Sequence, residues 1–304
     1  MSEEERRGVV FGFEVRSAQS FSYLREGTGE PLFVDNDDPG PCPDEEPLLR
    51  WVRRPDNPFE ADLYDRGEDY LVRIADLGCF AVAPRAGRIS APTTGDRVRI
   101  EERLWGIPAA LCLAERGDVP VHAAAVDVGG RALVFCGPSH FGKTTLAAAF
   151  LHAGHRVLSE DLTCCKLTPS PMVLPGPAML RIRPDVFERL GPIAGTRTTL
   201  EERDRIHVAF DRERSGTGDP VPLAGIVVLR RGPQDLQLYR VEAMRFLPEL
   251  FAMSFNLPSD VDRARGFSAA LDLATAVPFW VLDRPLRFEL LDDVIARIVE
   301  TCLD

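Results

Sequence analysis

The chain has 304 residues, of which 45% are hydrophobic and 27% are charged, and its formal net charge is −11. This length supports a buried core in one large domain or two smaller ones. The acidic balance argues against nucleic acid as a partner, and no apolar run reaches the ~18 residues that a membrane span requires. Because the first seven residues are charged and lack the apolar core of a signal peptide, we expect a cytoplasmic protein.

The chain contains seven cysteines, an odd number, without a C-x-x-C spacing. In a cytoplasmic protein this pattern predicts reduced and mostly buried thiols. Cys164 and Cys165 are adjacent and would point to opposite faces of a strand, so they are poorly placed to share a metal ion.

The N-terminal part, residues 1–98, is expected to be a β-rich subdomain. Strands are predicted where β-branched and aromatic residues gather, at 9–15, 70–74, 77–82 and 88–90. The intervening stretch 34–47 has four prolines and six acidic residues, which predicts an exposed loop. An acidic docking surface is the alternative interpretation of this stretch.

An amphipathic helix is predicted over residues 96–116, because Leu104, Ile107, Leu111 and Ala114 recur at spacings of three and four. Pro108 is expected to weaken or bend this helix, and Gly117 to end it. A strand over 119–128 and a turn at 129–130 follow.

The next segment, residues 132–152, has the pattern of a strand, a tight loop and a helix. Its loop, residues 137–144, fits G-x-x-x-x-G-K-S/T, the phosphate-binding P-loop. Such a loop turns at glycines so that backbone N–H groups and a helix N-terminus face phosphate oxygens. An ordinary strand-to-helix turn is the alternative. We expect ATP to be bound by Gly137, Pro138, Ser139, His140, Phe141, Gly142, Lys143, Thr144 and Thr145, with the Thr144 hydroxyl on Mg²⁺.

A second strand over 155–158 ends at Glu160 and Asp161. In a strand–helix–strand unit the two strands run parallel, so both acids are expected at the sheet edge where the P-loop lies. One acid can orient Mg²⁺ while the other faces an attacking hydroxyl. A pair of solvated surface acids is the alternative.

The remainder of the chain is expected to be mostly scaffold. Arg181 and Arg183 would share one face of an extended segment and could bind a phosphate or a carboxylate, or be surface charges. The polar residues 191–222 are interpreted as a mobile loop, either a lid or a segment without a role. A buried strand is predicted at 223–229, a short strand at 279–282, and helices at 243–253, 260–273 and 291–302.

Three stretches together, 121–126, the P-loop and 154–162, resemble the C-terminal domain of HPr serine kinase/phosphorylase. They resemble more closely the HPr-kinase-like proteins associated with lasso-peptide and other peptide natural-product biosynthesis. The resemblance implies an α/β P-loop kinase core, akin to phosphoenolpyruvate carboxykinase, over residues 99–304. It also implies transfer of the ATP γ-phosphoryl group to a serine hydroxyl of a peptide or protein.

Residue by residue, the resemblance implies that Lys143 binds phosphate, Thr144 and Asp161 hold the metal, Glu160 deprotonates the acceptor and His122 helps to position the site. The chain departs from the family pattern at three positions: His140 replaces the usual glycine, Phe141 is bulky, and Glu160 replaces the usual aspartate. The N-terminal half does not resemble that of the authentic HPr kinases, so HPr itself is not the expected acceptor. Two other functions stay open, a small-molecule hydroxyl kinase and a nucleotide-gated binding protein without phosphoryl transfer, and the oligomeric state is undetermined.

Overall fold

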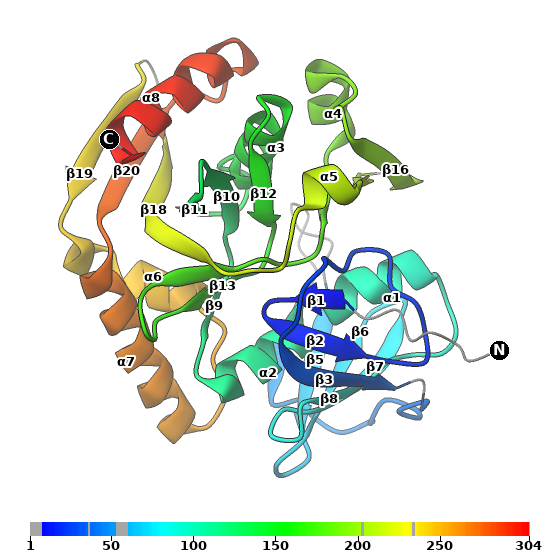
Figure 1. The fold of residues 1–304 in the computed structure, drawn as a ribbon. Helices are drawn as coiled ribbons and strands as arrows, with labels where there is room; N and C mark the ends of the chain where they lie inside the picture. The colour runs from blue at the N-terminus through cyan, green and yellow to red at the C-terminus, as the bar shows by residue number, and fades with distance from the viewer. Residues whose placement is uncertain (1–7, 36, 53–59, 202–203, 233–234, 304) are drawn as a thin grey trace.

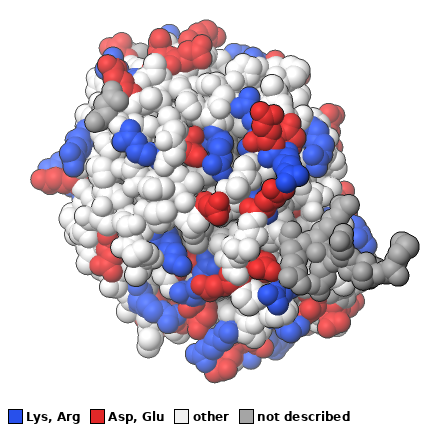
Figure 2. Space-filling view, in the orientation of Figure 1, with Lys and Arg blue, Asp and Glu red and all other residues white. Residues whose placement is uncertain are grey.

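The computed structural model describes residues 8–35, 37–52, 60–201, 204–232 and 235–303. They form a mixed α/β structure with three sheets of eight, nine and three strands (Figure 1). Among these residues, no helix combines the length and the apolar character needed to cross a membrane. Acidic and basic side chains are interspersed over the face that Figure 2 shows.

The eight-stranded sheet is built from the N-terminal part of the chain. Its strand order is β1-β2-β3-β8-β7-β6-β5-β4, so β4 is an edge strand. The strands predicted at 70–74, 77–82 and 88–90 are present. The prediction of one strand over 9–15 is wrong, because the chain turns at Phe11 and Gly12, both with positive φ, and forms two antiparallel strands, β1 and β2. Strands β3 to β5 are additions that the sequence does not predict. The bounds are β1 (Gly8–Val10), β2 (Phe13–Arg16), β3 (Glu30–Asp35), β4 (Leu49–Trp51), β5 (Ala61–Asp65), β6 (Tyr70–Ile74), β7 (Gly78–Ala83) and β8 (Arg88–Ser90).

Two helices, α1 (Arg97–Leu104) and α2 (Ile107–Arg116), pack their apolar faces on this sheet. The prediction of one bent helix is wrong, because the chain breaks at Gly106 and a new helix begins there. Pro108 lies in the first turn of α2, where its missing N–H costs nothing, so it starts a helix rather than bending one. Gly117 ends α2 in the left-handed conformation, as expected.

The nine-stranded sheet forms the centre of the second half of the molecule. The predicted strand over 119–128 is divided at His122 and Ala123 into two strands with different neighbours. The sheet contains β9 (Val119–Val121), β10 (Ala124–Val128), β11 (Arg131–Cys136), β12 (Arg156–Ser159), β13 (Thr163–Lys166), β14 (Met172–Leu174), β18 (Val221–Arg231), β19 (Gln237–Val241) and β20 (Phe279–Arg284).

Helices cover both faces of this sheet (Figure 1). On one face, α3 (Lys143–His152) and α8 (Leu291–Leu303) share a core with Phe135, Phe150 and Leu282. On the other face lie α6 (Leu247–Met253), which follows the 3-10 turn η1 (Ala243–Arg245), and α7 (Asp260–Ala276). A second 3-10 turn, η2 (Phe288–Leu290), precedes α8. These elements agree with the C-terminal helices and strand that the sequence predicts.

Strands β11 and β12 run parallel, as expected, but they are not neighbours. Strand β10 lies between them and pairs antiparallel with each. Two antiparallel steps restore the same direction, so the carboxyl ends of β11 and β12 still open at one edge of the sheet.

The third sheet overturns the prediction of a mobile loop over 191–222. It consists of β15 (Met179–Ile182), β17 (Ile206–Phe210) and β16 (Thr196–Glu201), and the short helices α4 (Pro184–Leu190) and α5 (Arg212–Ser215) flank it. The residues of β17 are all buried, several of them in the core under α3. The free energy gained by burying this apolar run is larger than the tendency of the polar residues around it to form a loop.

The cysteine prediction is wrong for two of the seven thiols. Cys42, in the acidic loop after β3, forms a disulfide with Cys79 in β7. Their sequence separation of 37 carries no pairing signal, because the fold brings them together. The other five cysteines are free and buried. Cys164 and Cys165 enter different cores on opposite sides of β13, as predicted.

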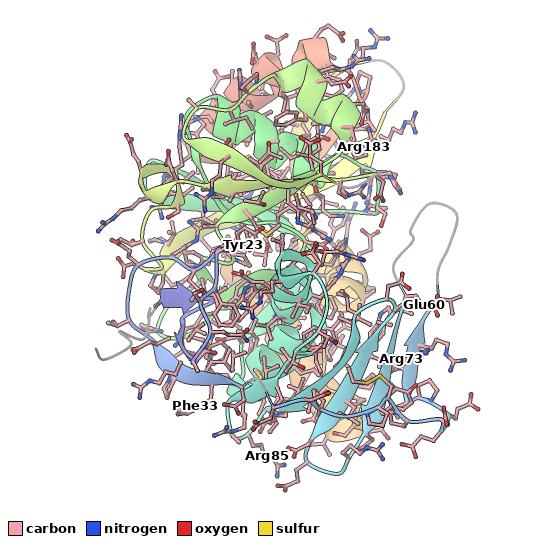
Figure 3. All side chains as sticks on the ribbon, turned by 90° about the vertical axis from the view of Figure 1, so that its right-hand side faces the viewer. Tyr23, Phe33, Glu60, Arg73, Arg85 and Arg183 are labelled. Carbon is pink, nitrogen blue, oxygen red and sulfur yellow. A yellow bond between two sulfur atoms is a disulfide. The ribbon has the colours of Figure 1, made fainter. Side chains whose placement is uncertain are left out.

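The segment after β2 joins the N-terminal sheet to the nine-stranded sheet, and Figure 3 shows Tyr23 at this junction. Arg25 is fully buried here and donates to four backbone carbonyls. Its Nε bonds Gly176 O at 2.8 Å, its Nη2 bonds the carbonyls of Val157 and Leu158 at 2.9 and 3.2 Å, and its Nη1 bonds Ser215 O. The guanidinium therefore ties the two halves of the chain together.

Candidate active site

Residues 137–142, the glycine loop, connect β11 to α3. The backbone φ is +148° at Gly137, +64° at His140 and +89° at Gly142. The φ of His140 lies in the left-handed region, which glycine adopts more easily than a residue with a Cβ. Gly142 caps α3 without a side-chain hydrogen bond, so no capping side chain takes up the first N–H groups of the helix.

The side chain of Lys143 folds back onto the glycine loop. Its Nζ donates to the carbonyls of Gly137 at 2.8 Å and Pro138 at 3.3 Å. Burial lowers the pKa of Lys143, and the nearby carboxylates of Asp161 and Glu160 partly oppose that shift. The loop thus holds a buried cation where the P-loop pattern requires one.

Thr144 and Glu160 connect the start of α3 to the end of β12. The Thr144 hydroxyl donates to Glu160 Oε1 at 2.8 Å. The Glu160 side chain is only 9% exposed, and burial raises its pKa against the opposing effect of Arg181. The predicted proximity of the acid pair to the loop is therefore present.

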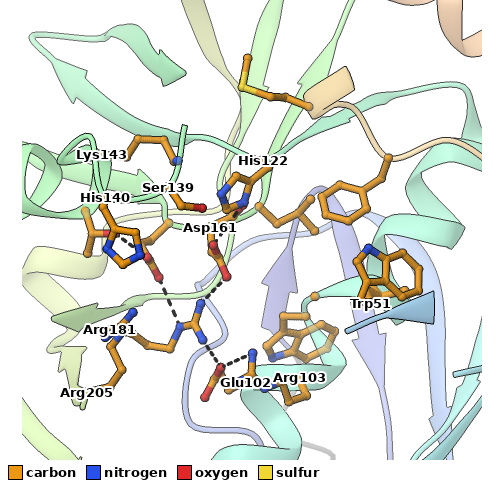
Figure 4. Close-up of a pocket in the computed structure, with 18 of the residues that line it drawn as sticks. Trp51, Glu102, Arg103, His122, Ser139, His140, Lys143, Asp161, Arg181 and Arg205 are labelled. Carbon is orange, nitrogen blue, oxygen red and sulfur yellow. Dashed lines mark hydrogen bonds and ion pairs between the residues drawn. The ribbon is translucent and has the colours of Figure 1, made fainter. Parts of the chain in front are cut away.

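Arg181, from β15, lies among three carboxylates and joins them (Figure 4). Its guanidinium pairs with Glu102 and with Asp161, and its Nε lies 3.5 Å from Glu160 Oε2. Arg183 keeps an extended backbone, with φ −68° and ψ 147°, and lines the same cavity as Arg181, as expected. Its guanidinium is exposed, however, and bonds Asp185 at 2.8 Å at the start of α4 and not the acids that Arg181 joins (Figure 3).

Asp161 has its backbone in the left-handed region, with φ +69°, and its side chain is 45% exposed. Nδ1 of His122 lies 3.0 Å from the Asp161 carbonyl oxygen and 3.3 Å from its Oδ1. Burial opposes ionisation of Asp161, but Arg181 and His122 outweigh it and hold the pKa of this carboxyl well below its usual range. Burial lowers the pKa of His122, so a neutral ring with the proton on Nδ1 fits these contacts.

Sequence reasoning missed Glu102 and His207, which complete this network. Glu102, from α1, lies 3.1 Å from Arg103 Nη1 and 3.4 Å from the Nε2 of the buried His207 in β17. Neither residue belongs to a motif. A signal for His207 was its place in the apolar run of β17, but that run was interpreted as part of a loop.

These groups line one cavity of about 1250 Å³. From the glycine loop and the start of α3, Ser139, His140, Gly142, Lys143, Thr144 and Thr145 line it, whereas Phe141 packs against the core under α3. His122, both acids and Arg181 also line it. The cavity continues to Trp51 of the N-terminal sheet, to Trp105, and to the segment 251–258 (Figure 4).

The other two histidines of α3 and its neighbourhood do not line the cavity. His152 is exposed, and the ring of His155 packs 5.4 Å from that of Phe150. Neither therefore joins the site, and a structural role for both remains the expectation from the sequence.

The described residues hold no group of three or more His, Cys, Asp or Glu side chains that could bind a metal ion. Thr144 with Glu160 or Asp161 nevertheless provides oxygen donors beside the glycine loop. This small set fits Mg²⁺, which takes one or two protein ligands and completes its shell with phosphate oxygens and water.

No protein-family model matches the sequence, and no curated protein matches it. Among solved structures, the chain is similar to the Hpr(Ser) kinase/phosphatase from Coxiella burnetii, with a TM-score of 0.31 and 12% sequence identity. The match covers 60% of this chain and 95% of that one. A similarity at this level does not transfer a function, so the function proposed below rests on the site.

Proposed function

We propose that the chain is an ATP- and Mg²⁺-dependent kinase that transfers the γ-phosphoryl group to a hydroxyl, in first place a serine of a peptide. One observation carries this proposal: the lysine and threonine of the P-loop pattern and the Glu160–Asp161 pair line the same cavity, with Thr144 and Glu160 2.8 Å apart. Phosphoryl transfer needs positioning and charge stabilisation from such groups.

The phosphates are bound at the glycine loop and the start of α3. Backbone N–H groups there and the positive end of the α3 dipole favour an anion. Lys143 exchanges its two carbonyl contacts for phosphate oxygens, which removes the burial penalty on its charge. Bound Mg²⁺ supplies charge neutralisation on the transferred group.

The contacts of the two acids favour a division of roles that reverses the sequence-based one. Glu160 is buried and bonded to the Thr144 hydroxyl, so Glu160 and Thr144 together would hold the metal. Asp161 lines the cavity and its side chain is 45% exposed, so an acceptor hydroxyl can reach it and give up its proton to this carboxylate. As the acceptor oxygen bonds to the γ-phosphorus, the bond to the bridging oxygen breaks and ADP leaves. His122 is a positioning residue for Asp161.

The size of the cavity favours a peptide acceptor. Its volume, about 1250 Å³, exceeds the ~300–1,000 Å³ of most small-molecule sites. The part beyond Asp161 is lined by Trp51, Trp105 and residues 251–258, which are mostly apolar or aromatic. A peptide can extend along these walls while its serine reaches Asp161. A small hydroxyl acceptor is the alternative outcome of the test.

Mass spectrometry tests the activity directly. The protein is incubated with Mg·ATP and peptides encoded near its gene, and phosphate adducts are sought on peptides and on small hydroxyl compounds. We expect a phosphopeptide, its loss in Lys143→Ala, and no adduct without Mg²⁺. If ATP binds tightly and no acceptor is ever modified, the kinase proposal is wrong.

The same assay separates the roles of the two acids. Glu160→Gln should raise the Mg²⁺ concentration needed for half-maximal rate, and Asp161→Asn should lower kcat with little change in that concentration. The reverse pattern would restore the sequence-based assignment of Glu160 as base and Asp161 as metal ligand.

One observation favours a second function, a nucleotide-gated binding protein. Arg181 engages both acids and Glu102 at once, which holds them away from an acceptor. For that function, nucleotide would stabilise a partner-binding conformation without phosphoryl transfer. ATP-dependent peptide capture without any adduct or ADP release would support it.

A further inference from the structure

Arg284 is a buried arginine that none of the steps above uses. It is the last residue of β20 and is 3% exposed. Its strand runs parallel to β18, which in turn runs parallel to β11. The carboxyl ends of all three strands therefore open at the edge where the glycine loop leaves β11, and Arg284 lines the same cavity.

The guanidinium of Arg284 lies directly against the glycine loop. A Cβ atom built on Gly142 would come within 2.9 Å of Arg284 Nη2. Gly142 is the residue before Lys143 and caps α3. The arginine and the helix N-terminus thus converge on the place where the P-loop pattern binds phosphate.

Arg284 differs from Arg25 and Arg181 because one of its buried N–H groups has no hydrogen-bond partner among the described residues. Arg25 donates to four carbonyls and Arg181 joins three carboxylates. In contrast, Nη2 of Arg284 is buried and has no hydrogen-bond partner among the described residues. Burial lowers the pKa of Arg284 without a compensating anion. A buried cation without an anion is costly, so its retention points to a ligand that supplies the anion.

We propose that Arg284 binds the diphosphate part of the nucleotide and acts as a phosphate-binding residue supplied from outside the P-loop. This inference rests on the proposed nucleotide binding and adds a residue that selects nucleotides by their number of phosphates. Loop N–H groups cradle the α- and β-phosphates, and Lys143 reaches the β- and γ-phosphates. Because Arg284 lies against Gly142, its guanidinium reaches the phosphates that ADP and ATP share. It therefore selects nucleotides with at least two phosphates, and it does not read the γ-phosphate.

The test compares Arg284→Met and Arg284→Lys with a matched control, Arg231→Gln. Arg231 lies opposite Arg284 on β18, is exposed and does not line the cavity. Affinities for ADP and ATP are measured by calorimetry, and the Tm of each protein is measured without nucleotide. Because hydrogen bonds to a charged group are lost, we expect Arg284→Met to weaken ADP and ATP binding equally, by roughly 10- to 100-fold. We expect an intermediate loss for Arg284→Lys and none for Arg231→Gln.

The nucleotide-free Tm separates ligand binding from a structural role. Removal of an unpaired buried charge should leave the Tm of Arg284→Met unchanged or raise it. A Tm that falls together with the affinity would assign Arg284 to packing and overturn the inference. So would unchanged binding in Arg284→Met, or a loss confined to ATP. If the wild type binds neither ADP nor ATP, the proposed function itself fails, which is a different result from wild-type binding that the variant retains.

Discussion

The ion cluster around Arg181 should be the most sensitive electrostatic feature of the fold. Glu102 and Glu160 are almost fully buried, and Asp161 lies beside them. In Arg181→Met these carboxylates lose their shared cation while the apolar volume of the side chain is largely kept. Removal of one partner from a buried ion pair typically costs about 3–5 kcal/mol. We expect a loss in unfolding free energy of that size at pH 7.5, measured by urea denaturation.

The pH dependence of this loss checks its electrostatic origin. Burial already raises the folded-state pKa of Glu160, and Arg181 opposes that rise, so without Arg181 this pKa lies further above its unfolded value. A group with a raised folded pKa stabilises the fold below its unfolded pKa and loses that contribution as the pH rises. The penalty in Arg181→Met should therefore shrink as the pH falls from 7.5 toward 5.

Arg183→Met is the matched control, since Arg183 is the same residue type two positions away but pairs with Asp185 on the surface. Its cost should stay below about 1 kcal/mol at either pH. Equal losses for the two variants, or a loss for Arg181→Met that does not change with pH, would refute the assignment of Arg181 as the centre of the cluster.

Three further predictions concern other parts of the structure. Burial raises the pKa of Glu101 to about 7, although its carboxylate accepts hydrogen bonds from the backbone N–H groups of Ser22 and Tyr23. Relative to Glu101→Gln, the wild type should therefore lose about 3 kcal/mol of unfolding free energy between pH 4.5 and 8, and a constant difference in urea titrations would contradict this. Gly142 has a φ of +89°, and a Cβ there would contact Arg284, so Gly142→Ala should lower the unfolding free energy by about 1–2 kcal/mol and abolish nucleotide binding. The control is Gly154→Ala, where φ is +97° but the surrounding space is open, and it should lower the unfolding free energy by only about 1 kcal/mol, from backbone strain. Arg25→Met should lose at least about 3 kcal/mol in urea denaturation, because it removes charge-assisted bonds to buried carbonyls, and a loss below 1 kcal/mol would mean that these carbonyls find other partners.

The parts of the site that the sequence predicts are those that lie close together in the chain. The glycine loop is recognisable because six loop residues and two helix residues follow one short pattern. Arg181 and Arg183 follow from their residue type and extended context, and both line the cavity. The sequence does not separate their partners: Arg181 joins the buried carboxylates, whereas Arg183 pairs with Asp185 at the start of α4.

The parts that the sequence does not predict come from distant elements that tertiary packing brings to the cavity. Glu102 lies on a helix that packs against the N-terminal sheet, and Arg284 ends a strand near the C-terminus. Nothing in their local sequence separates them from other charged residues. His207 carried a weak signal, since it lies in an apolar run, but the surrounding arginines led to a loop prediction. The loop prediction used the average composition of residues 191–222, and that average hides a strand as short as β17 (Ile206–Phe210).

The acid pair shows why one topological prediction holds although the assumed neighbours are wrong. We expected β11 and β12 to lie close together, and β10 lies between them. The position of Glu160 depends on strand direction and not on adjacency, because parallel strands deliver their carboxyl ends to one edge however many strands separate them. The start of α3 then extends along that edge far enough for Thr144 to reach Glu160 at 2.8 Å. The same rule applies to β20, which lies two strands from β11 on the side opposite β12 and runs parallel to it. The carboxyl end of β20 therefore places Arg284 next to Gly142. The glycine loop is therefore approached from both sides of its strand, by carboxylates from β12 and by a cation from β20, which is the distribution of charge that a metal-bound phosphate chain requires.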